Sequence, residues 1–252
     1  MRIWDLHPGY LNRQSLLGEH RELHGMVSII VNGKKGYSRH PETLRWMDFG
    51  WVLNKRHQLL CAEMKLRGYN DKSPVQIQDN NGMWPDTFID EPYVQIRLLR
   101  EKYRDKEPGR IPLPQNAQQM WRQHKYAVMA RDVGLYKNIG ADVARMRPRD
   151  DFSGLARLLV ETLRTPPSQG GLKNALQHMW GYVSDRYEES REPLHGWPLT
   201  DLLARIQDLA FKYKEPYLME SVALSEFAVW IHGNRTSRAQ IPPTSDSRSG
   251  RK

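Results

Sequence analysis

The chain has 252 residues and is 39% hydrophobic, which is enough for one large domain or for two smaller domains with separate cores. This composition excludes a chain that is disordered throughout, and the single cysteine, Cys61, excludes a fold held by internal disulfide bonds. The net charge of +9 favours a polyanionic partner, because cations placed near phosphates release condensed counterions.

Apolar residues recur mainly at helical spacing, and no alternation of apolar and polar residues extends beyond a few positions. The fold class is therefore predicted to be all-α. Caps, prolines and turn residues then set the ends of the helices expected in the first half. These helices are expected over 12–31, 41–46, 51–67 and 91–103.

Proline, glycine and charge concentrate in residues 105–114, where the apolar periodicity lapses, and residues 108–114 are predicted to be an interdomain linker. Two helical domains are expected on either side of it, at 1–107 and 115–232. Residues 233–252 have almost nothing to bury and predict a disordered basic tail. Helices of the second domain are expected over 115–131, 150–163, 171–187 and 198–214.

No apolar run approaches the ~20 residues of a membrane span, and the first residues lack the apolar block of a signal peptide. We therefore expect a cytoplasmic protein without a membrane partner.

One face of the first expected helix places a glutamate among small residues. Ser15, Gly18, Glu22 and Gly25 share a lane at spacings of three and four residues, and Ile29 closes it. Small neighbours leave a trough through which another backbone or a ligand can approach the carboxylate. Periodicity alone favours the alternative, in which the helix simply packs tightly and the glutamate lies on a solvated edge.

His20, Glu22 and His24 superficially resemble metal-binding motifs. In the HExxH motif the glutamate directly follows the first histidine, whereas Glu22 lies two positions after His20, roughly opposite it around the helix. The zinc deaminase signature also needs a PCxxC pair, and the chain has one cysteine. The sequence therefore predicts no metal site and no cofactor. The charged triplet at 55–57 is expected on a helix surface.

Three stretches carry a family resemblance: MRIWDLHPGYLNRQSLLGEHREL, the basic loop GKKGYSRHP, and NKRHQLLCAEMKLRGYN. Over about the first hundred residues they resemble the pyrimidine-dimer DNA glycosylase family. Arg2 matches the early arginine of that family, and Arg21 and Glu22 match its arginine-glutamate pair. The resemblance implies an all-α enzyme that removes a damaged base and then cleaves the abasic strand.

The resemblance also implies that the nucleophile is the α-amino group of the first residue, here Met1. Because Arg2 is large, we expect Met1 to be retained. An α-amine titrates at about 7.7 to 8.0, so a substantial neutral fraction is available near pH 7. Glu22 is then the implied acid/base and electrostatic partner of the amine. Arg2 and Arg21 are implied to hold phosphates or stabilise developing charge, with ordinary surface or ion-pair roles as the alternative.

Lys34, Lys35, Arg39 and Arg45 lie in and just after the basic loop, near a helix start. Together with the family resemblance, they are expected to grip the DNA backbone without reading its sequence, and a plain solvated loop is the alternative. The damaged nucleotide is expected to leave the stack. Gly25 stands where the phage member of the family carries an arginine, so the sequence leaves the lesion specificity open.

In the second half, WRQHKYAVMA, NALQHMWGY and EPYLMES resemble the YbgA-type domain of unknown function, over about 115–227. That domain occurs beside nucleobase-processing modules, which suggests an accessory role in nucleic-acid binding. One helix face there combines Asn174, Gln177 and His178, which could contact bases or sugars. Buried hydrogen bonds between helices explain these polar residues equally well.

The leading hypothesis is therefore a cofactor-independent DNA glycosylase and abasic-site lyase that acts on damaged double-stranded DNA. The alternative is a non-catalytic protein, or one directed at RNA such as tRNA, whose second domain selects a structured RNA. Gly25 and the unprocessed Met1 keep that alternative open.

Overall fold

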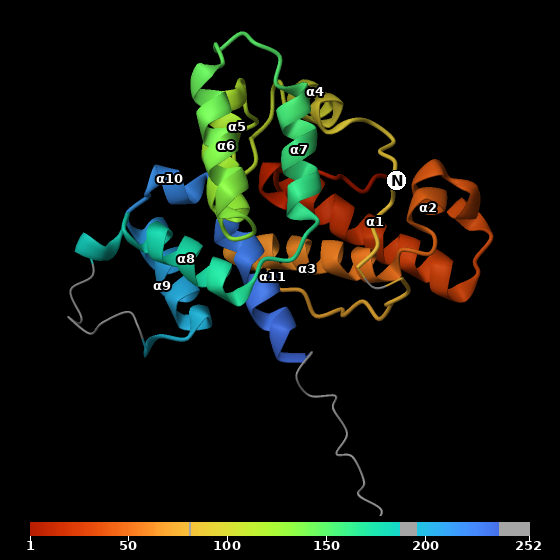
Figure 1. The fold of residues 1–252 in the computed structure, drawn as a ribbon. Helices are drawn as coiled ribbons and strands as arrows, with labels where there is room; N and C mark the ends of the chain where they lie inside the picture. The colour runs from red at the N-terminus through yellow and green to blue at the C-terminus, as the bar shows by residue number, and fades with distance from the viewer. Residues whose placement is uncertain (81, 187–195, 237–252) are drawn as a thin grey trace, which may run out of the picture.

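The computed structural model describes the chain except residues 81, 187–195 and 237–252, and it describes side chains up to residue 231. The described residues form α-helices and short 3-10 helices without any strand (Figure 1), which confirms the all-α prediction. None of the helices in these parts of the chain is both long and apolar enough to cross a membrane.

The helices of the first half follow the local sequence signals closely. The Asn12 side chain accepts the backbone N–H of Ser15 at 2.9 Å, and Gly33 ends the same helix in the left-handed conformation at φ 60°. The predicted start of this helix is thus confirmed, and the helix runs one residue further than predicted, through Asn32. The helices are α1 (Arg13–Asn32), α2 (Pro41–Trp46), α3 (Gly50–Leu66) and α4 (Pro92–Lys102).

The second half contains seven α-helices in its described part, including three that lie outside the predicted ranges, α6, the short α10 and α11. Two glycines weaken the helical signal of α6, and Gly140 faces the Trp121 ring. In α11 apolar residues occur on every side, so no amphipathic stripe marks it in the sequence. The helices are α5 (Ala117–Met129), α6 (Val133–Arg145), α7 (Ser153–Leu163), α8 (Gln169–Trp180), α9 (Leu199–Lys212), α10 (Pro216–Met219) and α11 (Ala223–Thr236).

Helix α11 lies beside α3 of the first half and also contacts α5, α8 and α9 (Figure 1). One hydrophobic cluster combines the amino-terminal segment, α1, α3 and α4 with side chains of α5, α6 and α7. A second cluster fills the space between α8, α9 and α11. Helices from the two halves of the sequence therefore share a continuous apolar contact.

The segment 108–114, predicted as a linker, packs against the first half. Ile111 is fully buried, and its N–H donates to the Gly9 carbonyl at 2.9 Å. Arg110 donates to the buried Glu63 carboxylate at 2.7 and 2.9 Å. Burial by itself would raise the pKa of Glu63, but the Arg110 guanidinium holds that pKa well below its usual range.

The predicted tail begins inside helix α11, because residues 233–236 are the end of that helix. The remainder of the tail lies outside the described residues.

Candidate active site

The amino-terminal segment is fixed by a buried ion pair between α1 and α3. Arg56 donates to both oxygens of Glu19, at 2.6 and 2.8 Å, and to the Leu6 carbonyl at 2.7 Å. Glu19 also accepts the backbone N–H of Trp4 at 3.2 Å. The expectation that residues 55–57 lie on the surface is wrong for Arg56 and His57, which are both buried. Arg56 instead holds the start of the chain against α1.

This segment brings the first two residues to Glu22. The backbone N–H of Arg2 donates to Glu22 Oε2 at 2.6 Å, although the two residues are 20 positions apart in the sequence. The α-amine of Met1 is three covalent bonds from the amide nitrogen that donates to Glu22. A Cβ placed at Gly18 or Gly25 would meet nothing within 4 Å. The face of α1 that carries Glu22 is therefore open on both sides of the carboxylate.

The Arg2 guanidinium lies between two carboxylates that the sequence analysis did not identify. Its Nη1 donates to Asp90 Oδ2 at 2.5 Å, and its Nε lies 3.6 Å from Glu42 Oε1. The guanidinium also covers the Trp4 ring, 4.5 Å from the ring centroid. Glu42 is buried and its other oxygen accepts the Trp46 indole N–H at 3.0 Å. These contacts hold Arg2 in place and balance much of its charge within the protein.

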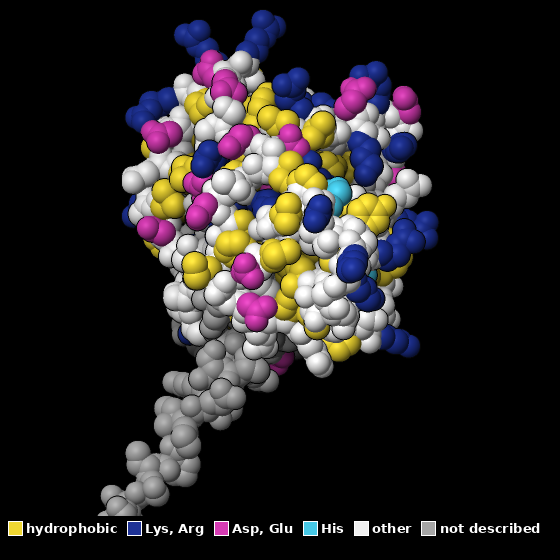
Figure 2. All heavy atoms as spheres, turned by 90° about the vertical axis from the view of Figure 1, so that its right-hand side faces the viewer, with side chains coloured by type: hydrophobic (Ala, Val, Ile, Leu, Met, Phe, Trp, Pro, Cys, Tyr) yellow, Lys and Arg dark blue, Asp and Glu magenta, His cyan; other side chains and the backbone are white. Residues whose placement is uncertain are grey.

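The remaining predicted cations fall into two groups. Arg21, Lys34, Lys35 and Arg39 are exposed, and Lys34 donates to Ser28 Oγ at 2.8 Å. Figure 2 shows the face around α2 and the loop before it, where Lys and Arg side chains gather in the right half of the view. Most Asp and Glu side chains of this face lie in the left half or at the top.

Arg45 does not belong to this exposed group. Its side chain is only 4% exposed, and it donates to Asp5 Oδ1 at 2.6 Å and to the Thr87 carbonyl at 2.8 Å. Its guanidinium also lies 4.8 Å from the centroid of the Trp46 ring. A cation enclosed in this way has no surface to offer a phosphate, so the structure corrects the prediction for Arg45. Its contacts instead join α2 to the amino-terminal segment.

The polar residues proposed in the second half share one helix, α8. Asn174 and Gln177 are partly buried, and His178 is exposed. Figure 1 shows α8 on the other side of the molecule from the amino terminus. These three residues therefore form a surface separate from Met1, Arg2 and Glu22.

Sequence reasoning missed a second gathering of side chains. The structure brings His20 and His24 of α1 together with His57 of α3 and with Asp71. The motif test considered only ligands along one helix and rejected HExxH on its spacing. The separation of four residues between His20 and His24, which puts both on one helix face, is the signal that could have indicated this cluster.

Comparison with known families supports both halves of the chain. Residues 1–77 match the family described as pyrimidine dimer DNA glycosylase, and residues 125–228 match a protein family of unknown function, DUF1722. Both predicted resemblances are thus confirmed, in the predicted order. No curated protein and no solved structure matches the chain significantly. The first match supports a DNA-glycosylase-like repair function and a DNA partner at the level of the family, whereas nothing in the matches concerns RNA.

Proposed function

We propose that the protein is a DNA glycosylase with abasic-site lyase activity on pyrimidine-dimer DNA and that the Met1 amine is its nucleophile. The observation that carries the proposal is the hydrogen bond of 2.6 Å between the Arg2 amide and Glu22, within a region that matches the glycosylase family. It places a carboxylate beside the residue that bears the amine, on an open helix face.

The proposed reaction begins with the neutral amine. Its nitrogen bonds to C1′ of the damaged nucleotide, and the bond from C1′ to the base breaks with its electron pair going to the base. The sugar ring then opens as the nitrogen and C1′ form an imine. Loss of a proton from C2′ pushes electrons toward C3′ and expels the 3′ phosphate, and water finally hydrolyses the imine. Glu22 accepts and returns protons in these steps and stabilises the positively charged imine.

The charge distribution favours contacts with the DNA backbone rather than with base edges. We assign phosphate contacts to the exposed Arg21, Lys34, Lys35 and Arg39, since side chains of this kind position a duplex without reading its sequence. Arg2 is assigned to positioning the amine, because Asp90 and Glu42 already engage its guanidinium.

We retain the proposed division into a glycosylase domain and an accessory domain that assists nucleic-acid binding. Asn174, Gln177 and His178 of α8 are its candidate contacts. Because they lie apart from the amino terminus, their replacement is expected to change affinity and to leave the covalent chemistry intact.

The test is borohydride trapping of tag-free protein on three duplexes, which contain an ultraviolet dimer, an abasic site or no damage. Borohydride reduces the imine to a stable amine, and peptide mapping then locates the adduct. We expect a dimer-dependent adduct at Met1 that disappears when the amine is acetylated. An adduct on abasic DNA alone would reduce the proposal to a lyase. Absence of any adduct, together with preferential binding of tRNA, would refute the proposal in favour of an RNA-directed protein.

Matched variants separate the role of Glu22 from a general loss of charge. Glu22→Gln is expected to abolish strand cleavage while it retains most of the DNA affinity. Glu101→Gln is the control, because Glu101 is an exposed carboxylate on α4 whose partner is Arg104 of the same segment. Equal activity of both variants would remove Glu22 from the mechanism.

A further inference from the structure

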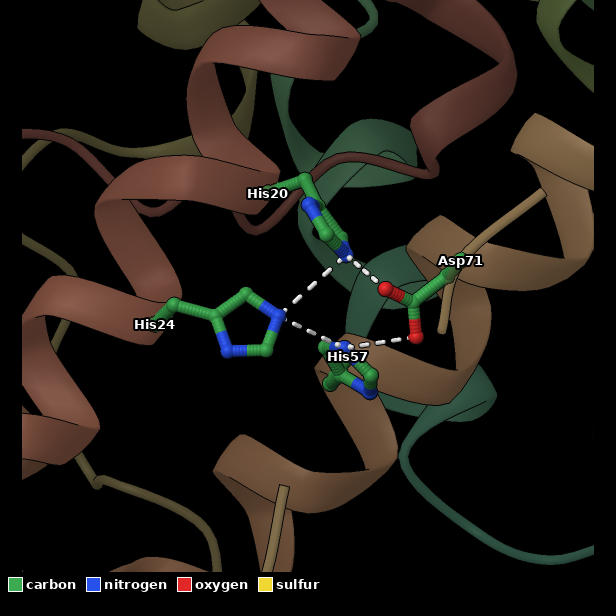
Figure 3. Close-up of side chains that lie close together, drawn as sticks. All are labelled: His20, His24, His57 and Asp71. Carbon is green, nitrogen blue, oxygen red and sulfur yellow. Dashed lines mark hydrogen bonds and ion pairs between the residues drawn. The ribbon is translucent and has the colours of Figure 1, made fainter. Parts of the chain in front are cut away.

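Four side chains from three segments converge on one point between α1 and α3 (Figure 3). His20 and His24 come from successive turns of α1, His57 comes from α3, and Asp71 follows the end of α3. The four ligand atoms lie within 4.8 Å of one another. His57 is 7% exposed at its side chain, and His20 and Asp71 are 13% and 14% exposed.

The imidazoles point the same type of atom at one another. His24 Nε2 lies 3.3 Å from His20 Nε2 and 3.1 Å from His57 Nε2. Asp71 completes the group, with Oδ1 at 3.2 Å from His20 Nε2 and Oδ2 at 3.6 Å from His57 Nε2. A neutral imidazole carries one N–H. Without a metal, the facing Nε2 atoms can form hydrogen bonds to one another only where one of them carries the proton and the other accepts it. A cation at the centre would satisfy all of them through their lone pairs.

We propose that His20, His24, His57 and Asp71 form a binding site for a divalent transition-metal ion, with Zn²⁺ as the expected occupant. Zinc bonds to nitrogen and oxygen are about 2.0 to 2.1 Å long, so neighbouring ligand atoms of a tetrahedral ion are about 3.3 Å apart. The contacts of His24 Nε2 with His20 and His57 and of Asp71 Oδ1 with His20 range from 3.1 to 3.3 Å, close to that value, and all four ligand atoms lie within 4.8 Å of one another. Three imidazoles select a transition ion over Mg²⁺ or Ca²⁺, which prefer oxygen ligands.

Neighbouring groups also lie against the ligands and fix their positions. The backbone N–H of Ser73 donates to Asp71 Oδ1 at 3.1 Å and fixes the carboxylate. Cys61 lies one turn after His57, with its sulfur 3.5 Å from His57 Nε2.

The geometry assigns the ion a structural role. Four protein ligands complete a tetrahedron and leave no position for substrate, as in closed structural zinc sites. His20 and His24 each lie two residues from Glu22, which is about 200° around α1, so the ion and Glu22 occupy opposite faces of the helix. The ion would fasten α1, the helix that carries Glu22, to α3 and to the segment after it. This inference does not rest on the proposed glycosylase reaction.

The test measures metal binding by full-length protein purified without a histidine tag. After EDTA treatment, the protein is titrated with Zn²⁺ and with Co²⁺, and bound metal per chain is measured by mass spectrometry. We expect one ion per chain, intense visible absorption from tetrahedral Co²⁺, and a thermal midpoint that rises with Zn²⁺. A wild-type protein that binds neither ion at micromolar concentration overturns the proposal.

The matched variants are His24→Ala and His178→Ala, the second at an exposed histidine of α8. His24→Ala is expected to weaken metal binding at least about tenfold and to lose the Zn²⁺-dependent thermal shift. His178→Ala is expected to bind metal as the wild type does. Undiminished binding by a folded His24→Ala protein, checked by circular dichroism, overturns the assignment. If that variant does not fold, the wild-type stoichiometry and Co²⁺ spectrum decide the question.

Discussion

Replacing Arg56 by methionine would leave the Glu19 carboxylate buried without its cation. Glu19 is 2% exposed and receives two hydrogen bonds from Arg56, at 2.6 and 2.8 Å. Burial already raises the pKa of Glu19, and Arg56 is the main influence that opposes this rise. Removing one partner of a buried ion pair costs about 3–5 kcal/mol, because the other charge stays desolvated. A domain of this size is stable by about 5–15 kcal/mol, so Arg56→Met is expected to remove a large fraction of the stability.

The assay is urea unfolding followed by circular dichroism, on Arg56→Met, Glu19→Gln and the double variant. The double variant is expected to recover about 2–3 kcal/mol relative to the sum of the two single losses, because it removes both charges together. Arg104→Met is the control, since Arg104 pairs with Glu101 at an exposed position and such pairs are worth at most about 1 kcal/mol. A loss in Arg56→Met no larger than in Arg104→Met would refute the reasoning.

Three further predictions concern pH, close packing and DNA affinity. Burial lowers the pKa of His124 to about 4, below the value near 6.5 in the unfolded chain. The contribution of the neutral imidazole to the free energy of unfolding is therefore fully present above pH 6.5 and is lost as the pH falls toward 4. Unfolding free energies measured across this range should vary less in His124→Gln, and an unchanged pH dependence would contradict this. A Cβ at Gly171 would lie 1.9 Å from the Ala130 carbonyl oxygen, whereas a Cβ at Gly170 would meet nothing within 4 Å. Thermal unfolding should therefore show that Gly171→Ala destabilises the protein by about 1–3 kcal/mol and that Gly170→Ala leaves its stability unchanged or slightly raised. Equal thermal midpoints of the two variants would contradict this prediction. The slope of log K for DNA binding against log salt concentration is negative. Replacing both Lys34 and Lys35 by glutamine should make this slope less steep by about 1 to 2, without altering the stability of the protein. An unchanged slope in fluorescence anisotropy titrations would exclude these lysines from phosphate contact.

Local signals predicted most helices because their causes are local. The Asn12 cap and the left-handed Gly33 fix the ends of α1 through contacts within a few residues. Helix α11 was missed for the opposite reason. Every residue from Ser221 to Phe227 is buried, and a helix surrounded by other helices shows no polar face in its sequence.

The family resemblance made part of the candidate site predictable, because it supplied the roles of individual residues. The rest could not be predicted, because it depends on side-chain partners from distant segments of the chain. Glu22 and Arg2 were singled out from the sequence, and the structure joins them by a hydrogen bond. Arg45 was expected to contact the DNA backbone and Arg56 to lie on a helix surface, and both expectations require an exposed side chain. Their carboxylate partners, Asp5 and Glu19, lie 40 and 37 positions away, so no local pattern could show that these cations are buried.

The sequence by itself determined the helical class, the ends of the capped helices and the two family resemblances, because these depend on local chemistry and on the order of residues. Tertiary structure decided which charges are free and which are enclosed, since that depends on the folded path of the chain. It also decided that His20 and His24 face His57 and Asp71. Helical spacing can align two histidines, but only the packing of α1 on α3 brings the other two ligands within reach.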